Sequence, residues 1–241
     1  GARFIVSPGF DPAVVDYCIA QKIPVFPGTT NPSEISAGVA RGLTCLKFFP
    51  AEQSGGVAML NALAGPFPGV TFMPTGGVSE ANLGSYVRLK NVLACGGTWM
   101  VKPELIAAGD WAGITTLTRG AVLALHGFAL AHLGLNAPND RAAQETVNLI
   151  SLFGFPAMPP YTESIFNGTA FETMKGNGRG TNGHVGIKTW DVERALAYCE
   201  RHGFKAVTDS ASWTGTPEKS PLRLIYLDRE INGFAFHLVR A

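Results

Sequence analysis

Short apolar runs recur along the N-terminal part of the chain, and each is closed by proline or glycine. They are ARFIVSPG (2–9), IPVFPG (23–28), LTCLKFFPAE (43–52), VTFMPTGG (70–77) and VLACGGTW (92–99). The segments between them carry helix-start signals, because Asp11 and Asn31 each precede a proline and Ser79 precedes a third helical segment. Runs that are apolar on both faces suit parallel strands covered by helices, so the pattern predicts an α/β fold.

Two architectures accommodate this β-α-β-α alternation, a closed β/α barrel and an open doubly wound sheet. Five such units do not close an eight-stranded barrel. The chain opens GARFIVSPGF, without an initiator methionine, and is inside an apolar run within three residues. For a (β/α)8 TIM-type barrel we therefore expect the chain to hold the last five β/α units, with three strands upstream of Gly1.

The C-terminal part of the sequence has a different character. The apolar stretch AVLALHGFALAHLGL (121–135) is too short to span a bilayer and is expected to form a buried helix. LNAPND (135–140) is typical of a linker, so we place the domains at 1–137 and 138–241. The runs HVGIKT, DVERALAYCERHG, FKAVT, RLIYLD and GFAFHLVR predict a small α+β domain of order β-α-β-β-β. The helix DRAAQETVNLISLFG with strands ESIFNG and AFETMK is interpreted as a second, incomplete copy.

Composition narrows the class of protein. With 46% hydrophobic and 15% charged residues the chain can bury a sizeable core. Nineteen basic residues against eighteen acidic ones, without a basic block, predict no nucleic-acid or membrane-surface partner. The four cysteines (Cys18, Cys45, Cys95 and Cys199) are widely spaced and form no CxxC pair, which favours reduced thiols and a cytoplasmic location.

Lys47 stands inside an apolar run, between Leu46 and Phe48, near the end of the third predicted strand. An ammonium group is rarely buried unless it is paired or loses its proton. An apolar surround lowers the pKa of a lysine and supplies the neutral amine that attacks a ketone to form a Schiff base. The alternative is a buried stem whose ammonium reaches solvent or pairs with Glu52.

Two glycine pairs, Gly76-Gly77 and Gly96-Gly97, close successive predicted strands, each ahead of a predicted helix. The last two strand ends of a β/α barrel are a recurrent phosphate site, built from backbone N–H groups and a helix N-terminus. The hydroxyl of Thr98 could contribute to such a site. The alternative is ordinary turn chemistry, since glycine is common wherever a strand ends.

SPG, KFFPAE, AGPFPGV, PTGG and GGTW follow one another over residues 2–125 with an order and spacing that resemble the 2-keto-3-deoxy-6-phosphogluconate / 4-hydroxy-2-oxoglutarate aldolases. These are class I enzymes with a β/α barrel that assemble as trimers. The resemblance implies that Lys47 is the Schiff-base lysine. It implies substrate-binding residues Pro8, Phe49 and Thr75. It implies a phosphate site formed by Gly76, Gly77, Gly97 and Thr98, where the family commonly has serine in place of Thr98.

The activity implied by this resemblance is a retro-aldol cleavage that needs no cofactor or metal. A phosphorylated 2-keto acid, or 4-hydroxy-2-oxoglutarate, would yield pyruvate and an aldehyde; the galactonate epimer is a further candidate substrate. The family's general-base glutamate and a nearby arginine would lie upstream of Gly1, so we expect this chain alone to be weakly active or inactive. A non-catalytic sugar-phosphate binding fragment is the alternative.

The C-terminal β-α-β-β-β pattern is similar to a vicinal-oxygen-chelate, or glyoxalase-like, module. In that superfamily, histidine or glutamate residues on the first and last strands bind a divalent metal. Here His184 and His237 occupy comparable predicted strands. Two histidines are an incomplete ligand set. The open alternatives are therefore a metal-dependent glyoxalase-like enzyme and a metal-free appendage.

Overall fold

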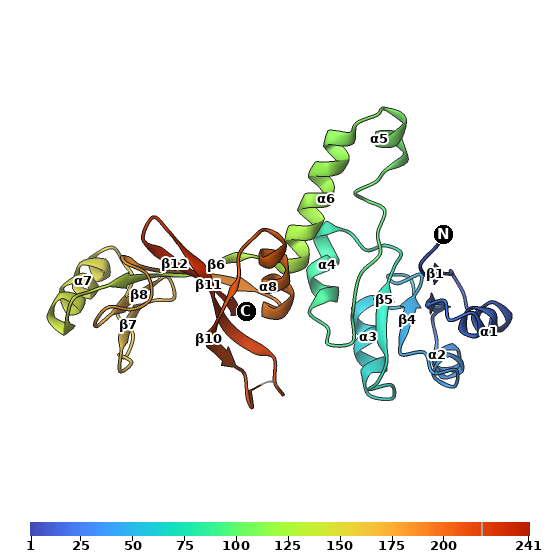
Figure 1. Ribbon diagram of the computed structural model, residues 1–241, viewed down its shortest axis with the longest axis horizontal. Coiled ribbons are helices and arrows are strands. Elements are labelled where there is room, and N and C mark those ends of the chain that lie inside the picture. Colours follow the sequence, from blue (N-terminus) through green and yellow to red (C-terminus); the bar gives the residue numbers. More distant parts are fainter. Residues whose placement is uncertain (218) are drawn as a thin grey trace. The chain divides into compact units, whose positions relative to one another are not determined.

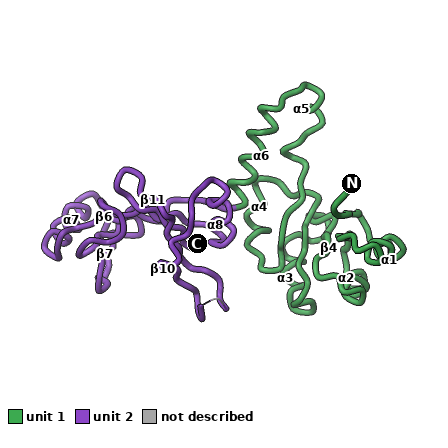
Figure 2. Tube along the Cα trace, viewed as in Figure 1, with its two compact units in different colours: residues 1–125 green, residues 126–241 purple. Residues whose placement is uncertain are grey.

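Two units divide the chain, Gly1–Leu125 and His126–Ala241 (Figure 2). The computed structural model describes residues 1–217 and 219–241 (Figure 1). The division falls earlier than the predicted one between residues 137 and 138. The physical reason is that residues 129–136, predicted as the end of a helix, form a central strand of the C-terminal sheet.

The N-terminal unit is built on parallel strands that follow chain order. These are β1 (Ile5–Val6), β2 (Val25–Phe26), β3 (Gly28–Thr29), β4 (Cys45–Phe48) and β5 (Thr71–Pro74). β1 pairs with β2, β3 with β4 and β4 with β5, all parallel. Single parallel bridges from Phe72 to Val92 and from Thr75 to Gly96 add the fifth apolar run beside β5. The predicted α/β class is thereby confirmed.

Helices connect these strands where the sequence signals them. They are α1 (Pro12–Ala20), α2 (Pro32–Val39), α3 (Gly56–Ala64), α4 (Glu80–Val87), α5 (Pro103–Ala107) and α6 (Trp111–His126). Asp11 and Asn31 cap α1 and α2 through their side chains, and Ser79 forms a capping box with Asn82 on α4. These three predicted helix starts are confirmed. The strands and helices bury Leu46, Phe48, Phe72 and other apolar side chains. This close packing holds the strands of the sheet in fixed positions.

The expected helix over residues 121–135 is wrong in its second half. α6 ends at His126, and β6 covers Ala129–Asn136. Gly127 causes the change of direction, because it has a φ of +61° and a Cβ at this position would come within 2.0 Å of the Trp190 ring. No helix in the described part of the chain is long and apolar enough to cross a membrane.

The C-terminal unit is a seven-stranded sheet with two helices. Its elements are β6, α7 (Asp140–Leu152), β7 (Ser164–Asn167), β8 (Phe171–Met174), β9 (Gly183–Thr189), α8 (Val192–Arg201), β10 (Ala206–Trp213), β11 (Leu222–Ile231) and β12 (Phe234–Arg240). The strand order is β10-β11-β12-β9-β6-β8-β7. The predicted β-α-β-β-β order from β9 to β12 is confirmed.

The sheet contains an internal repeat. β6 and β9 lie antiparallel at its centre, and each pairs in parallel with the last strand of its own half, β8 or β12. A single antiparallel bridge between Ala157 and Asn167 stands at the outer edge of the first half. The first copy is therefore more complete than predicted, because β6 supplies the strand that the sequence had assigned to a helix.

His126 gives the C-terminal unit a pH-dependent stability. Its ring is 2% exposed and lies against Phe128 and Tyr198, with centroids 4.9 and 4.8 Å away. Burial lowers the pKa of His126 to about 4; the charges of Arg194 and Arg201 add to this and Asp191 opposes it. An unfolded histidine takes up its proton near pH 6.5, so stability present above that pH is lost as the pH falls toward 4.

We expect this residue to lower the free energy of unfolding by on the order of 3 kcal/mol between pH 7 and pH 4. Urea unfolding of the wild type and His126→Phe at both pH values measures the effect, since phenylalanine keeps the ring packing and cannot titrate. An equal loss in both proteins would contradict the prediction.

Candidate functional site

The carboxyl ends of the parallel strands in the N-terminal unit are tied together by backbone hydrogen bonds. The N–H of Phe49 donates to Thr29 (3.3 Å), that of Thr75 to Phe48 (3.0 Å) and that of Gly96 to Pro74 (2.9 Å). Each bond links the end of one strand to the end of its neighbour. Lys47, Thr75 and the second glycine pair are therefore brought to one edge of the sheet, as strand ends in β/α proteins are.

Lys47 lies on β4 and is half-buried. Its Nζ stands 4.4 Å from the centroid of the Phe49 ring. Burial lowers the pKa of Lys47 below its ordinary value, which raises the share of the neutral amine. The geometry agrees with the nucleophile interpretation of the apolar run.

The carboxylates of Glu52 and Glu34 accept hydrogen bonds from residues other than Lys47. Glu52 accepts a hydrogen bond from the hydroxyl of Tyr86, and Glu34 accepts one from the backbone of Thr30 (2.6 Å). Across residues 1–217 and 219–241, no ion pair joins Lys47 to Glu52. The alternative role of Lys47 as the partner of Glu52 is not supported.

Thr75 and the first glycine pair form a compact turn after β5. A Cβ on Gly96 would lie 2.5 Å from the Thr75 hydroxyl oxygen, so the glycine lets the two strand ends approach. Gly76 and Gly77 have φ of +97° and +78°, and α4 begins directly after them at Glu80. A strand end, a glycine turn and a helix N-terminus thus follow one another here, as the predicted phosphate site requires.

The structure gives less support for the predicted roles of Gly97, Thr98 and Pro8. The Trp99 ring covers Gly97, where a Cβ would come within 1.8 Å of it, and Thr98 is exposed. A helix follows the second glycine pair as predicted, but it starts only at Pro103. Pro8 is exposed, and its carbonyl oxygen lies close against Gly28. The substrate and phosphate roles of these residues stay predictions.

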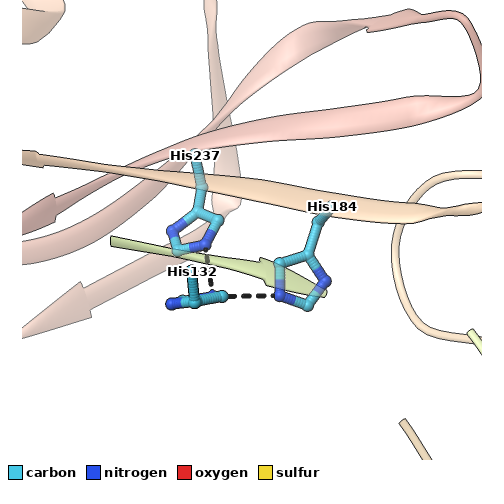
Figure 3. A group of neighbouring side chains, drawn as sticks. All are labelled: His132, His184 and His237. Carbon is cyan, nitrogen blue, oxygen red and sulfur yellow. Dashed lines mark hydrogen bonds between the residues drawn. The ribbon is translucent and has the colours of Figure 1, made fainter. Parts of the chain in front are cut away.

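A second cluster lies in the C-terminal unit, where His132, His184 and His237 converge (Figure 3). The Nε2 of His132 is 3.1 Å from that of His184 and 3.2 Å from that of His237. A carboxylate oxygen of Glu172 is 3.2 Å from the Nε2 of His184 and 3.3 Å from that of His132. His184 and His237 are buried, and His132 is half-buried.

The internal repeat of the sheet positions these four side chains. Each central strand carries a His-x-Gly pattern, His132 with Gly134 on β6 and His184 with Gly186 on β9. Gly186 lies opposite both His132 and His237, and Gly134 lies opposite both His184 and Glu172. A Cβ on Gly134 would come within 2.1 Å of the His184 ring, and one on Gly186 within 2.8 Å of His132. The two glycines make the room that the rings occupy.

The electrostatics of the cluster suit a cation. Burial lowers the pKa of His132, and the positive charges of His184 and Lys188 lower it further. The negative charge of Glu172 acts in the other direction and raises it. Burial, with the charges of the other two histidines, lowers the pKa of His237 to about 3. Burial alone would raise the pKa of Glu172, but hydrogen bonds with His184 and Ser164 hold it below its ordinary value. Neutral imidazoles beside a charged carboxylate are the forms that bind a metal.

The spacing of the donor atoms also fits a metal. Tetrahedral coordination with bonds of about 2.0–2.1 Å places ligand atoms about 3.3 Å apart. Four of the six separations among the donor atoms are 3.1 to 3.3 Å, close to this edge length, and the donor atoms of the three histidines all lie within 4.8 Å of one another. Nitrogen and carboxylate donors are those that Zn²⁺ and related divalent ions take.

His184 and His237 were predicted from the sequence, whereas the other two members of the cluster were missed. His132 was hidden because its segment was assigned to a helix, and Glu172 because nothing related its strand to β12. The repeated His-x-Gly pattern, HLG and HVG, was the available signal. It relates β6 to β9 and would have added His132.

Comparison with known proteins identifies the N-terminal segment. A family model described as KDPG and KHG aldolase matches residues 1–117. Residues 1–117, just under half of the chain, are therefore similar to this aldolase family. A 2-dehydro-3-deoxy-phosphogluconate aldolase from Treponema pallidum (strain Nichols) is 49% identical over 119 residues, which are 49% of this chain and 57% of the relative. The KHG/KDPG aldolase of Escherichia coli (strain K12) is 47% identical over 122 residues, covering 51% and 57% of the two chains.

Among solved structures, the KDPG aldolase of Legionella pneumophila with pyruvate captured as a covalent carbinolamine matches at 42% identity and a TM-score of 0.48. That match covers 48% of this chain and 57% of the other. The chain thus spans a little more than half the length of the aldolases it matches. Lys47 and Thr75 lie inside the segment that the family model matches, whereas the whole histidine cluster lies beyond it.

Proposed function

We propose that the N-terminal unit is the Schiff-base part of a class I aldolase that cleaves a 2-keto-3-deoxy sugar acid phosphate, or 4-hydroxy-2-oxoglutarate. The observation that carries the proposal is the half-buried Lys47, with its lowered pKa, at strand ends that belong to the KDPG and KHG aldolase family. The parallel wall from β1 to the Gly96 segment is consistent with part of a (β/α)8 barrel.

The chemistry begins when the neutral amine of Lys47 attacks the C2 ketone of the substrate and water is lost. The resulting iminium accepts the electron pair of the C3–C4 bond as that bond breaks. The C4 hydroxyl loses its proton and becomes a carbonyl, and the fragment that begins at C4 leaves as the aldehyde, glyceraldehyde 3-phosphate or glyoxylate. The remaining enamine takes up a proton at C3, and hydrolysis releases pyruvate and free Lys47. Glu34 and Glu52 accept hydrogen bonds from Thr30 and Tyr86, and neither is assigned as the acceptor of the hydroxyl proton.

The proposed substrate contacts follow from where each residue lies relative to Lys47. Phe49 packs beside the Lys47 amine and would border the pyruvyl group, and Thr75 at the next strand end would face the substrate. The turn at Gly76 and Gly77 would hold the phosphate on backbone N–H groups ahead of α4. Assembly as a trimer and a cytoplasmic location stay predictions.

Reductive trapping with pyruvate tests the aldolase proposal. We expect borohydride to reduce the iminium formed from Lys47 and pyruvate to a stable secondary amine, found by mass spectrometry on the peptide that contains Lys47. An adduct on other lysines only, in a protein shown to be folded, would contradict the proposal.

A second function is favoured by the histidine cluster. We propose that His132, His184, His237 and Glu172 bind one divalent metal ion, with Zn²⁺ as the first candidate. The donor spacing and the two facing glycines support it. Such an ion supplies Lewis-acid chemistry when bound. The glyoxalase-like activity predicted for residues 138–241 is proposed for the unit His126–Ala241, which also contains His132.

Thermal unfolding with and without Zn²⁺ tests the metal proposal. A ligand present at 100 times its dissociation constant stabilises the folded state by about 2.7 kcal/mol. We therefore expect Zn²⁺ to raise the unfolding temperature of the C-terminal unit and EDTA to reverse the shift. An unchanged temperature, with no heat of binding in calorimetry, would contradict it.

A further inference from the structure

A cavity of about 640 Å³ lies beside the histidine cluster in the C-terminal unit. Its walls come from β6, from the segment 158–161, from β7 and from the ends of β9 and β12. Cavities of this size are typical of sites for small organic molecules. Its position matters because His132 belongs both to its wall and to the cluster.

One wall of the cavity is apolar and aromatic. The Phe166 ring meets His132 edge to face, with centroids 5.6 Å apart, and Tyr161 meets Phe166 in the same way at 6.0 Å. Met158, Pro159 and Pro160 extend this surface. Such a surface suits the body of an apolar ligand, above all a ring.

Another part of the lining carries positive charge. Lys188 follows His184 and Gly186 at alternate positions of β9, so all three share one face of the sheet. Arg240 also lines the cavity, but its guanidinium already donates to Glu193 (2.8 Å), Leu222 (3.0 Å) and Trp190 (3.2 Å). Over the residues that the structure describes, the ammonium of Lys188 forms no hydrogen bond or ion pair. Lys188 is the cation that remains available to a ligand.

We propose that this cavity binds a small carboxylic acid with an apolar, ring-sized body, whose carboxylate pairs with Lys188 while the body lies against Tyr161 and Phe166. The ligand then lies next to His132 and so at the edge of the metal centre. This ligand class would be the substrate class of the proposed metal site, and that assignment rests on the metal proposal. The charge of Lys188 selects an anion, and the aromatic wall selects against small hydrophilic acids.

Binding of two matched probes to the Zn²⁺-treated full chain tests the inference. 3-Phenylpropionate carries the carboxylate, and 3-phenylpropanamide has the same body without the charge. We expect saturation-transfer NMR to show the acid binding about 10-fold more tightly than the amide, as one charge-assisted contact provides. Lys188→Gln should remove this preference, whereas Lys205→Gln, at another exposed lysine of the unit, should keep it. Equal binding of acid and amide, or an unchanged preference in Lys188→Gln, would overturn the proposal.

Replacing Zn²⁺ by Mn²⁺ tests the position of the ligand. We expect the paramagnetic ion to broaden the ring protons of the bound acid, and unbroadened signals in a protein that holds Mn²⁺ would overturn the placement beside His132. Calorimetry with the metal alone separates the two proposals. Acid binding that depends on Lys188 without metal binding would retain the acid site and refute the metal centre. Metal binding without acid binding would refute the acid site alone.

Discussion

Alanine in place of Gly186 is expected to weaken Zn²⁺ binding by about 100-fold or more while the C-terminal unit stays folded. The new Cβ would lie 2.8 Å from the Cε1 of His132 and 2.9 Å from the Nε2 of His237. These atoms are the far ends of side chains, so the rings can turn away and the backbone need not move. A loss of one outer-shell contact already costs roughly 10- to 100-fold in metal affinity, and here two ligand rings are displaced together.

Calorimetric titration measures the affinity, and circular dichroism checks the fold. Gly176→Ala is the matched control, because no atom lies within 4 Å of the Cβ it would add. Gly134→Ala should behave like Gly186→Ala, since its Cβ would meet the His184 ring. Wild-type affinity in both cluster variants would refute the assignment of these histidines as ligands.

Loss of pyruvate trapping in Lys47→Met is the second large effect that we expect. Methionine keeps an unbranched apolar side chain beside Phe49 but has no amine, so no iminium can form and borohydride labelling should fall to the background of surface lysines. Because the mechanism passes through this nitrogen, any aldol cleavage by the protein should be lost with it.

Lys90→Met is the control, since Lys90 is an exposed lysine of the same unit. It should keep full labelling at Lys47. Labelling should also rise with pH toward the ordinary pKa of lysine, with its onset below that of exposed lysines, because burial lowers the pKa of Lys47. Equal labelling of Lys47→Met and the wild type would rule out Lys47 as the Schiff-base residue.

Local sequence signals predicted most of the secondary structure correctly. Asp11, Asn31 and Ser79 begin helices because their side chains satisfy free backbone N–H groups, a short-range effect that sequence shows directly. The stretch 121–135 was mistaken for one helix because short apolar runs do not distinguish a helix from a central strand. The turn at Gly127 and the pairing of β6 with β9 make residues 129–136 a strand. They thereby also set the division between the two units.

The two candidate sites also differ in how far the sequence alone could predict them. Lys47 could be found from sequence because an ammonium in an apolar run is an energetic anomaly visible among its immediate neighbours. The complete histidine cluster could not, although two of its members were predicted, because its four donors are spread over residues 132–237 and meet only through strand register. The sequence by itself determined the α/β class and the helix starts, and it predicted Lys47 as the nucleophile. The tertiary structure alone decided which distant histidines face the same glycines, since a shift of one residue in either central strand would turn its histidine to the other face of the sheet.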